Sequence, residues 1–154
     1  MPQKILLVRT SSLGDIIHTL PIAYDIKHVM PDAKLHWLSE ESFSDVCTLS
    51  PFVDVVKKTA FRRWRKTLFS SKTWSEIRAL KADLRSEHYD IVIDTQGLLR
   101  SAWAASWPGS PVFGYSRDTV RESLATLFYN QTKRLPESIG TVRRYRKRAA
   151  LCLG

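Results

Sequence analysis

Cysteines and long apolar runs are both scarce in this chain of 154 residues. Cys47 and Cys152 lie far apart without the spacing of metal ligands, which indicates two reduced thiols. No apolar run approaches the roughly 18–20 residues that span a bilayer. The run at residues 5–8 is too short for the core of a secretory signal, and no small-residue cleavage site follows it. We therefore expect one domain, residues 1–154, that stays in the cytoplasm.

Glycine is also scarce where a nucleotide-binding loop would need it. The turn after the apolar run contains only Gly14, and neither a GxGxxG nor a Walker-type GK[ST] motif occurs in the chain. A dinucleotide site needs several glycines so that the backbone can approach the pyrophosphate. This absence disfavours an NAD-dependent dehydrogenase.

Acidic residues are outnumbered by basic ones, 15 against 24, which gives a net charge of +9. Nine cations and no acid occupy two short segments, residues 62–66 and 143–148, and these nine equal the whole excess. A positive field this concentrated indicates a polyanionic partner, for which nucleic acid, an anionic lipid surface and a phosphorylated small molecule are all candidates.

Short apolar runs alternate with segments of helical periodicity along the chain. We expect strands at residues 5–8, 35–38, 53–56, 91–93 and 112–115. We expect helices at residues 16–30, after 39–42, at 73–87, at 98–107, near 121–129 and from 138 onward. Residues 61–66 form a loop or a short helix. This alternation predicts an α/β fold with a Rossmann-like parallel sheet and helices on both faces.

Three local features refine that expectation. Pro21 should kink or split the first helix, because proline removes a helical hydrogen bond. Thr73 and Glu76 have the spacing of a capping box, with Thr73 as the cap. The last helix runs to Gly154 without further capping residues, which suggests that this chain is part of a longer protein.

The turn between the first strand and the first helix is the candidate site. Ligands of open α/β sheets bind at the carboxyl ends of the strands. Thr10, Ser11, Ser12 and Gly14 offer N–H groups and hydroxyls there, and Asp15 is the carboxylate beside them. Asp15 either complements the helix dipole or serves a ligand. Asp94, at the end of the fourth strand, either binds a sugar hydroxyl or caps the next helix.

The segment 61–69 interleaves Arg62, Arg63 and Lys66 with apolar side chains. Arginine binds phosphate with two hydrogen bonds, and the apolar residues can rest against lipid or a protein partner. The alternative is a solvated basic loop with Trp64 inserted into the core. The second cluster, at 143–148, is most simply the solvated face of an amphipathic helix.

Four motifs occur in a familiar order. Residues 10–21 read TSSLGDIIHTLP, 61–66 read FRRWRK, 94–98 read DTQGL, and Arg121-Glu122 precedes LFYN at 127–130. Together they resemble the bacterial lipopolysaccharide heptosyltransferases. The similarity covers nearly all of this chain but only about the N-terminal half of such an enzyme. The RRWRK segment favours the heptosyltransferase I type, with the heptosyltransferase II type as the alternative.

The resemblance implies an inverting GT-B glycosyltransferase that uses no metal and no cofactor. Its N-terminal domain holds the acceptor, Kdo-lipid A, at the cytoplasmic face of the inner membrane. A C-terminal nucleotide-sugar domain, absent from this chain, holds the donor ADP-L-glycero-D-manno-heptose, so the chain alone is expected to be inactive.

Residue by residue, Asp15 matches the general base of the family. The predicted acceptor-binding residues are Thr10, Ser11, Ser12, Gly14, Arg62, Arg63, Lys66, Asp94, Gln96 and Arg121. One departure is Gly140, near the position where the family commonly has a histidine before its last helix.

A non-catalytic basic module that binds nucleic acid or anionic lipid is the competing interpretation. The sequence has no RRM, KH or helix-turn-helix signature, so no nucleic-acid partner is expected.

Overall fold

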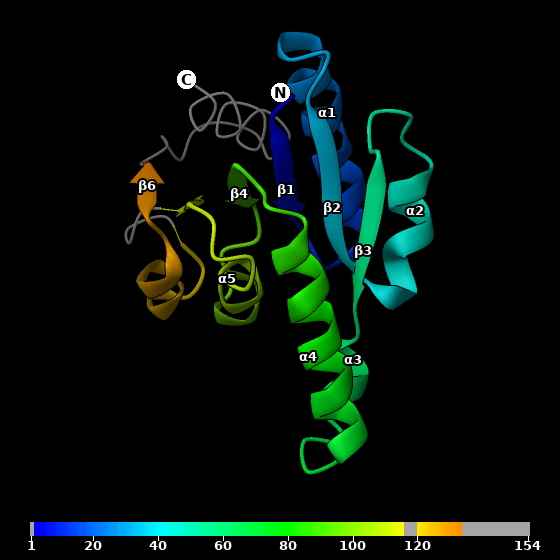
Figure 1. The fold of residues 1–154 in the computed structure, drawn as a ribbon, viewed down its shortest axis with the longest axis vertical. Coiled ribbons are helices and arrows are strands. Elements are labelled where there is room, and N and C mark those ends of the chain that lie inside the picture. Colours follow the sequence, from blue (N-terminus) through cyan, green and yellow to red (C-terminus); the bar gives the residue numbers. More distant parts are fainter. Residues whose placement is uncertain (1, 116–119, 134–154) are drawn as a thin grey trace.

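The computed structural model describes residues 2–115 and 120–133, and its centre is a parallel sheet of six strands. The strand order is β3-β2-β1-β4-β5-β6 (Figure 1). The strands are β1 (Lys4–Val8), β2 (Lys34–Glu40), β3 (Val55–Thr59), β4 (Ile91–Asp94), β5 (Val112–Tyr115) and β6 (Gln131–Lys133). Each neighbouring pair is parallel, so all six carboxyl ends share one edge of the sheet.

Alternating side chains of β1 enter two separate cores. Ile5 and Leu7 belong to the core under α1 (Leu13–Val29) and α2 (Ser44–Thr48). Leu6 and Val8 belong to the opposite core, which includes side chains of α3 (Phe61–Trp64), α4 (Ser71–Ser86) and α5 (Leu99–Ala105). All four side chains are fully buried, and each such burial contributes roughly 1.5–3 kcal/mol. The predicted fold, a Rossmann-like parallel sheet covered on both faces, is confirmed.

All five predicted strands are present, and β3 begins two residues later than expected. The sequence did not reveal β6, because Gln131, Thr132 and Lys133 are polar and give no apolar run. The helix expected near residues 121–129 is a short 3₁₀ helix, η2 (Ser123–Phe128), and another, η1 (Glu41–Phe43), precedes α2. The predicted final helix, Gly140 and the basic segment 143–148 lie outside the described residues.

The predicted split at Pro21 is wrong, because α1 continues through this residue. Buried Ile16, Ile22 and Ala23 lie on both sides of Pro21 and hold the helix against the sheet. Tertiary packing of this kind supplies most of a helix's stability, so it offsets the hydrogen bond that proline removes.

The predicted capping box is also wrong, because α4 begins earlier, after Ser70. The Thr73 hydroxyl lies 2.7 Å from the hydroxyl of Thr67, and the Glu76 carboxylate accepts a hydrogen bond of 2.6 Å from the Trp64 indole. These tertiary partners take the side chains that the local pattern assigned to the helix end.

Cys47 is a buried free thiol, as predicted, and burial raises its pKa to about 11. Cys152 lies outside the described residues. Within the described part of the chain, no helix combines the length and apolar character needed to cross a membrane.

Candidate active site

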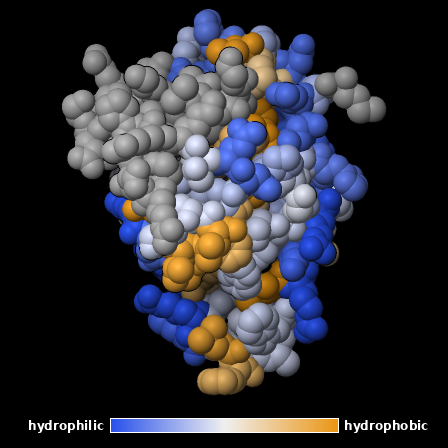
Figure 2. All heavy atoms as spheres, turned by 90° about the vertical axis from the view of Figure 1, so that its left-hand side faces the viewer, coloured by the Kyte–Doolittle hydropathy of each residue, from blue (hydrophilic) through white to orange (hydrophobic). Residues whose placement is uncertain are grey.

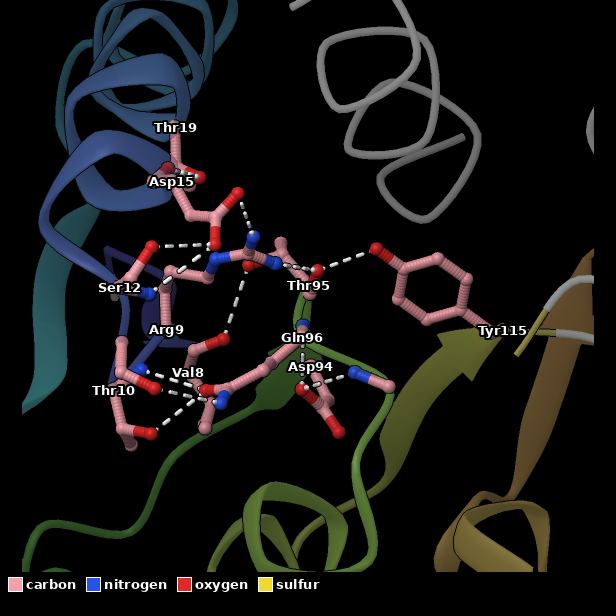
Figure 3. A network of polar contacts seen from close by, with 12 residues as sticks. Val8, Arg9, Thr10, Ser12, Asp15, Thr19, Asp94, Thr95, Gln96 and Tyr115 are labelled. Carbon is pink, nitrogen blue, oxygen red and sulfur yellow. Dashed lines mark hydrogen bonds and ion pairs between the residues drawn. The ribbon is translucent and has the colours of Figure 1, made fainter. Parts of the chain in front are cut away.

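The predicted turn lies where β1 and β4 end side by side (Figure 3). Val8 is paired with Asp94 in the register of these two strands. The backbone N–H and the hydroxyl of Thr95 both donate to the Val8 carbonyl, each at 3.1 Å. The residues that follow the two strands are therefore held beside each other at the carboxyl edge.

Asp15 lies in the first turn of α1 and is bound by two different partners. One carboxylate oxygen accepts hydrogen bonds from the Ser12 N–H at 3.2 Å and the Ser12 hydroxyl at 3.0 Å. The other forms an ion pair of 3.1 Å with Arg9. Partial burial opposes ionisation, but Ser12 and Arg9 outweigh it, so the pKa of Asp15 is lowered. Asp15 thus interacts with the helix end and, with 24% of its side chain exposed, also faces the surface.

Arg9 was not predicted from the sequence, although it directly follows the first apolar run. Its side chain is only 1% exposed. The guanidinium donates to the Thr95 carbonyl at 2.5 Å, while the Arg9 carbonyl accepts a 3.0 Å hydrogen bond from the Trp37 indole. A buried charge persists only where it is paired and hydrogen-bonded, and Asp15 and Thr95 provide this. Arg9 therefore fixes the direction of the Asp15 carboxylate from the buried side of the turn.

Gln96 connects the two strand ends through its side-chain amide. Its oxygen accepts hydrogen bonds from the Thr10 N–H at 2.9 Å and the Thr10 hydroxyl at 2.7 Å. Its nitrogen lies 3.2 Å from the hydroxyl of Ser11, which is also 3.0 Å from the guanidinium of Arg100. Thr10 and Gln96 are buried and shape the turn, whereas Ser12 and Gly14 are exposed and Ser11 is partly exposed.

Asp94 is fully buried and serves the turn that follows β4. One carboxylate oxygen accepts from the N–H of Gln96 at 2.9 Å, and the other from the hydroxyls of Ser101 at 3.0 Å and Tyr129 at 2.6 Å. Burial raises the pKa of Asp94, although these hydrogen bonds oppose the rise. Of the two roles considered for this residue, the contacts match the structural one at the helix entry, and its predicted contact with the acceptor stays a prediction.

Arg121 reaches the same site through its neighbour Glu122. The Glu122 N–H donates to the Gly97 carbonyl at 3.2 Å, and its carboxylate accepts from the Leu99 N–H at 2.6 Å. Gly97 has φ +71°, a conformation that glycine adopts without strain. Arg121 is exposed, and its charge is close enough to help lower the pKa of Asp15.

The basic segment is positioned by Glu40, a second residue that the sequence did not reveal. Glu40 is buried at the end of β2, and its N–H donates to the Thr10 carbonyl at 3.1 Å. Its carboxylate accepts from the N–H groups of Phe61 at 3.1 Å and Arg62 at 3.0 Å. The start of α3 is thereby tied to the same edge of the sheet as the turn with Asp15.

The three predicted cations of this segment differ in their surroundings. Arg63 pairs with Glu41 at 3.2 Å and with Glu76 at 2.7 Å, and these carboxylates raise the pKa of Arg63. Arg62 lies over the Phe43 ring at 4.6 Å, and Lys66 is exposed. Arg62 and Lys66 are therefore better placed than Arg63 to bind an added anion. Buried Trp64 anchors the segment, so the predicted core insertion and an exposed basic face coexist.

Three further features of the described residues complete the surroundings of this site. His18 is exposed on α1. No group of three or more His, Cys, Asp or Glu side chains within residues 2–115 and 120–133 is arranged to hold a metal ion. A surface hollow lined by Pro2, Lys27 and Lys34 lies at the opposite edge of the sheet.

Comparison with known proteins identifies the family. The family model of glycosyltransferase family 9, the heptosyltransferases, matches residues 77–154. The chain belongs to glycosyltransferase family 9. A lipopolysaccharide heptosyltransferase 1 of Pseudomonas aeruginosa is 45% identical over 129 residues, which are 83% of this chain and 36% of that protein. The Escherichia coli K12 protein of the same name is 39% identical over 152 residues, which are 98% of this chain and 48% of that protein.

The solved structure of the E. coli heptosyltransferase WaaC with ADP matches with a TM-score of 0.93 at 37% identity. The match covers 99% of this chain and 48% of that chain. This family 9 chain therefore spans about half the length, or less, of the relatives it matches. The resemblance inferred from the four motifs is confirmed.

Proposed function

We propose that this chain is the N-terminal, acceptor-binding part of a lipopolysaccharide heptosyltransferase I with GT-B architecture. The observation that carries the proposal is Asp15, an oriented and partly exposed carboxylate at the carboxyl edge of a Rossmann-like sheet. The names and identities of the relatives support heptosyl transfer as the reaction. The ADP in the matched E. coli structure supports an ADP-sugar donor.

In the proposed reaction Asp15 is the general base. It removes the proton from a Kdo hydroxyl while that oxygen attacks C1 of the heptose, and the bond from C1 to ADP breaks. One base and one displacement invert the anomeric carbon without a carboxylate nucleophile. The low pKa of Asp15 keeps it ionised but makes it a weak base, so accurate positioning must supply much of the rate.

The remaining predicted residues are proposed to receive the acceptor. Ser11, Ser12 and Gly14 form the exposed part of the turn, while Thr10, Asp94 and Gln96 act by fixing its shape. Arg62, Lys66 and Arg121, and less strongly Arg63, bind acceptor phosphates and carboxylates. Kdo-lipid A brings the protein to the cytoplasmic face of the inner membrane as a peripheral protein. The ADP-heptose site is proposed to lie outside these 154 residues.

The test is a transfer assay with the intact protein, ADP-heptose and Kdo-lipid A. We expect ADP release together with an acceptor that gains one heptose, as read by mass spectrometry. A parallel reaction offers an acceptor that already carries the first heptose. Transfer only to that second acceptor would establish the heptosyltransferase II type, and transfer to neither acceptor would overturn the proposal.

The basic residues give a separate prediction for binding. Replacing Arg62 and Lys66 together with alanine should raise the KM for an acyl-free, phosphorylated Kdo acceptor about tenfold, because hydrogen bonds to charged groups are lost. Since salt screens such charges, the difference should be largest at low ionic strength. Steady-state kinetics at several salt concentrations measure it, with Lys58→Ala on the exposed edge of β3 as control. Equal KM values at every salt concentration would refute this role.

A further inference from the structure

The loop between α3 and α4, together with the first turn of α4, carries an unusual apolar surface. Leu68 is 52% exposed, Phe69 104% and Trp74 45%. We call these three residues the apolar tip. In Figure 1 the loop extends below the sheet, and Figure 2 shows apolar surface at that lower end with hydrophilic side chains above it. Exposed apolar patches with a polar rim mark interaction surfaces.

The apolar tip is held in place by hydrogen bonds. The Trp74 indole donates to the Leu68 carbonyl at 2.7 Å, and the hydroxyls of Thr67 and Thr73 lie 2.7 Å apart. Behind them, the buried Trp64 donates its indole N–H to Glu76. The loop therefore presents Leu68 and Phe69 outward in an ordered structure. Binding of a partner then carries little entropic cost of ordering the loop.

Cations flank the apolar tip in the sequence. Residues 62–78 contain six Arg or Lys and one carboxylate, Glu76, which is already paired with Arg63. Within the described residues, the side chains of Arg65, Lys66 and Lys72 have no ion-pair partner. Exposed aromatic and aliphatic side chains with exposed cations on both sides in the sequence match an anionic bilayer surface, with its negative headgroups above an acyl layer.

The apolar tip also lies on the side of the molecule where the reaction is proposed. Strand β3 leads directly into α3, so the loop projects from the carboxyl edge of the sheet. The turn with Asp15 follows β1 at the same edge. A membrane that receives the apolar tip would therefore face the edge where a lipid-linked sugar must reach the base.

We propose that the apolar tip inserts into an anionic bilayer, with Phe69 among the acyl chains and Arg65 and Lys72 against the headgroups. This docking surface rests on the proposed function only for the identity of the membrane to which it binds. Lipid is favoured over a protein partner because the exposed cations Arg65, Lys66 and Lys72 flank Leu68 and Phe69 on both sides in the sequence, with no acidic residue between them. A protein partner is an outcome of the test.

The experiment is cosedimentation of the intact protein with vesicles of phosphatidylglycerol and phosphatidylcholine, without substrates. Phe69→Ser should weaken partitioning about tenfold, because a buried Phe side chain is lost from the lipid. Phe69→Trp should retain partitioning, since tryptophan favours the interface. Val29→Ser is the matched control, because Val29 is the exposed last residue of α1, which ends at the edge of the sheet opposite the carboxyl edge.

The contribution of the cations is tested with the double variant Arg65→Gln and Lys72→Gln. This pair should weaken binding to phosphatidylglycerol vesicles about tenfold and reduce its salt dependence, because each cation near an anionic surface contributes separately. Lys34→Gln at the opposite edge should bind as the wild type does. Pure phosphatidylcholine vesicles should bind weakly and should not distinguish the charge variants.

Equal vesicle binding by Phe69→Ser and the wild type would overturn the proposal. So would a wild-type dimer that ignores vesicles and that Phe69→Ser converts to monomer, since the apolar tip would then be a protein interface. With an acyl-free acceptor, Phe69→Ser should turn over at the wild-type rate. Vesicle binding without transfer by any variant would leave the docking surface standing and reject the proposed function.

Discussion

Asp15→Asn should lower the turnover number of heptosyl transfer by between about 10²- and 10⁴-fold, the contribution of a positioned general base. The amide retains an oxygen that can accept the Ser12 N–H, and the buried Arg9 guanidinium keeps its hydrogen bond to the Thr95 carbonyl. The acceptor KM should therefore change little. Steady-state kinetics of the intact protein with ADP-heptose and Kdo-lipid A measure both quantities.

Asp32→Asn is the matched control for this substitution. Asp32 is an exposed carboxylate in the turn after α1, at the opposite edge of the sheet from Asp15. The same change of charge there should leave turnover unaltered. Thermal unfolding of both variants checks that the fold is retained. Near-wild-type turnover of Asp15→Asn would remove Asp15 from the role of base.

The sequence was sufficient for the two-faced sheet because β1 alternates between two cores. Strand β4 is a similar apolar run. Because helical segments separate such runs along the chain, the strands they form are expected to be parallel. It was insufficient for Pro21 and Thr73, where tertiary contacts override the local preference. Strand β6 is polar and depends on its pairing with β5.

The candidate site was only partly predictable, because some of its contacts are local in the sequence and others join distant residues. Ser12 and Asp15 are three residues apart, so their contact is local and the pattern indicates it. Arg9 bonds Thr95 across 86 positions, and the buried Glu40 bonds Arg62 across 22. An arginine or a glutamate at a strand end is exposed in most proteins, so only the folded chain reveals that these two are buried and fix the turn and α3.

Arg9→Met should lower turnover by about ten- to a hundredfold, because Asp15 would lose the partner that fixes its direction, and small misplacements are costly. Methionine fills a buried space of similar length without a charge. The Thr95 carbonyl still accepts a hydrogen bond of 2.5 Å from the Tyr115 hydroxyl, so the fold should tolerate the change. Arg9→Lys restores the positive charge and should recover most of the turnover.

The dependence of turnover on pH separates positioning from simple destabilisation. The pKa of Asp15 is lowered from 3.8, so the base stays ionised, and the acid limb of the profile lies below that value. Without Arg9, burial raises the pKa with less opposition, and the acid limb should move to higher pH. The stability from ionised Asp15 is present above 3.8 and is lost as pH falls through the lowered pKa. In Arg9→Met this loss should begin at a higher pH.

Arg85→Met provides the matched control, because Arg85 also donates to a backbone carbonyl, that of Trp107 at 3.0 Å, but far from the turn. Loss of this hydrogen bond should cost about 0.5–1.5 kcal/mol of unfolding free energy and leave the pH profile in place. If Arg9→Met only weakened the fold, its profile would superimpose on those of Arg85→Met and the wild type. A shift of the acid limb in Arg9→Met alone, reversed in Arg9→Lys, requires that the buried guanidinium acts through Asp15.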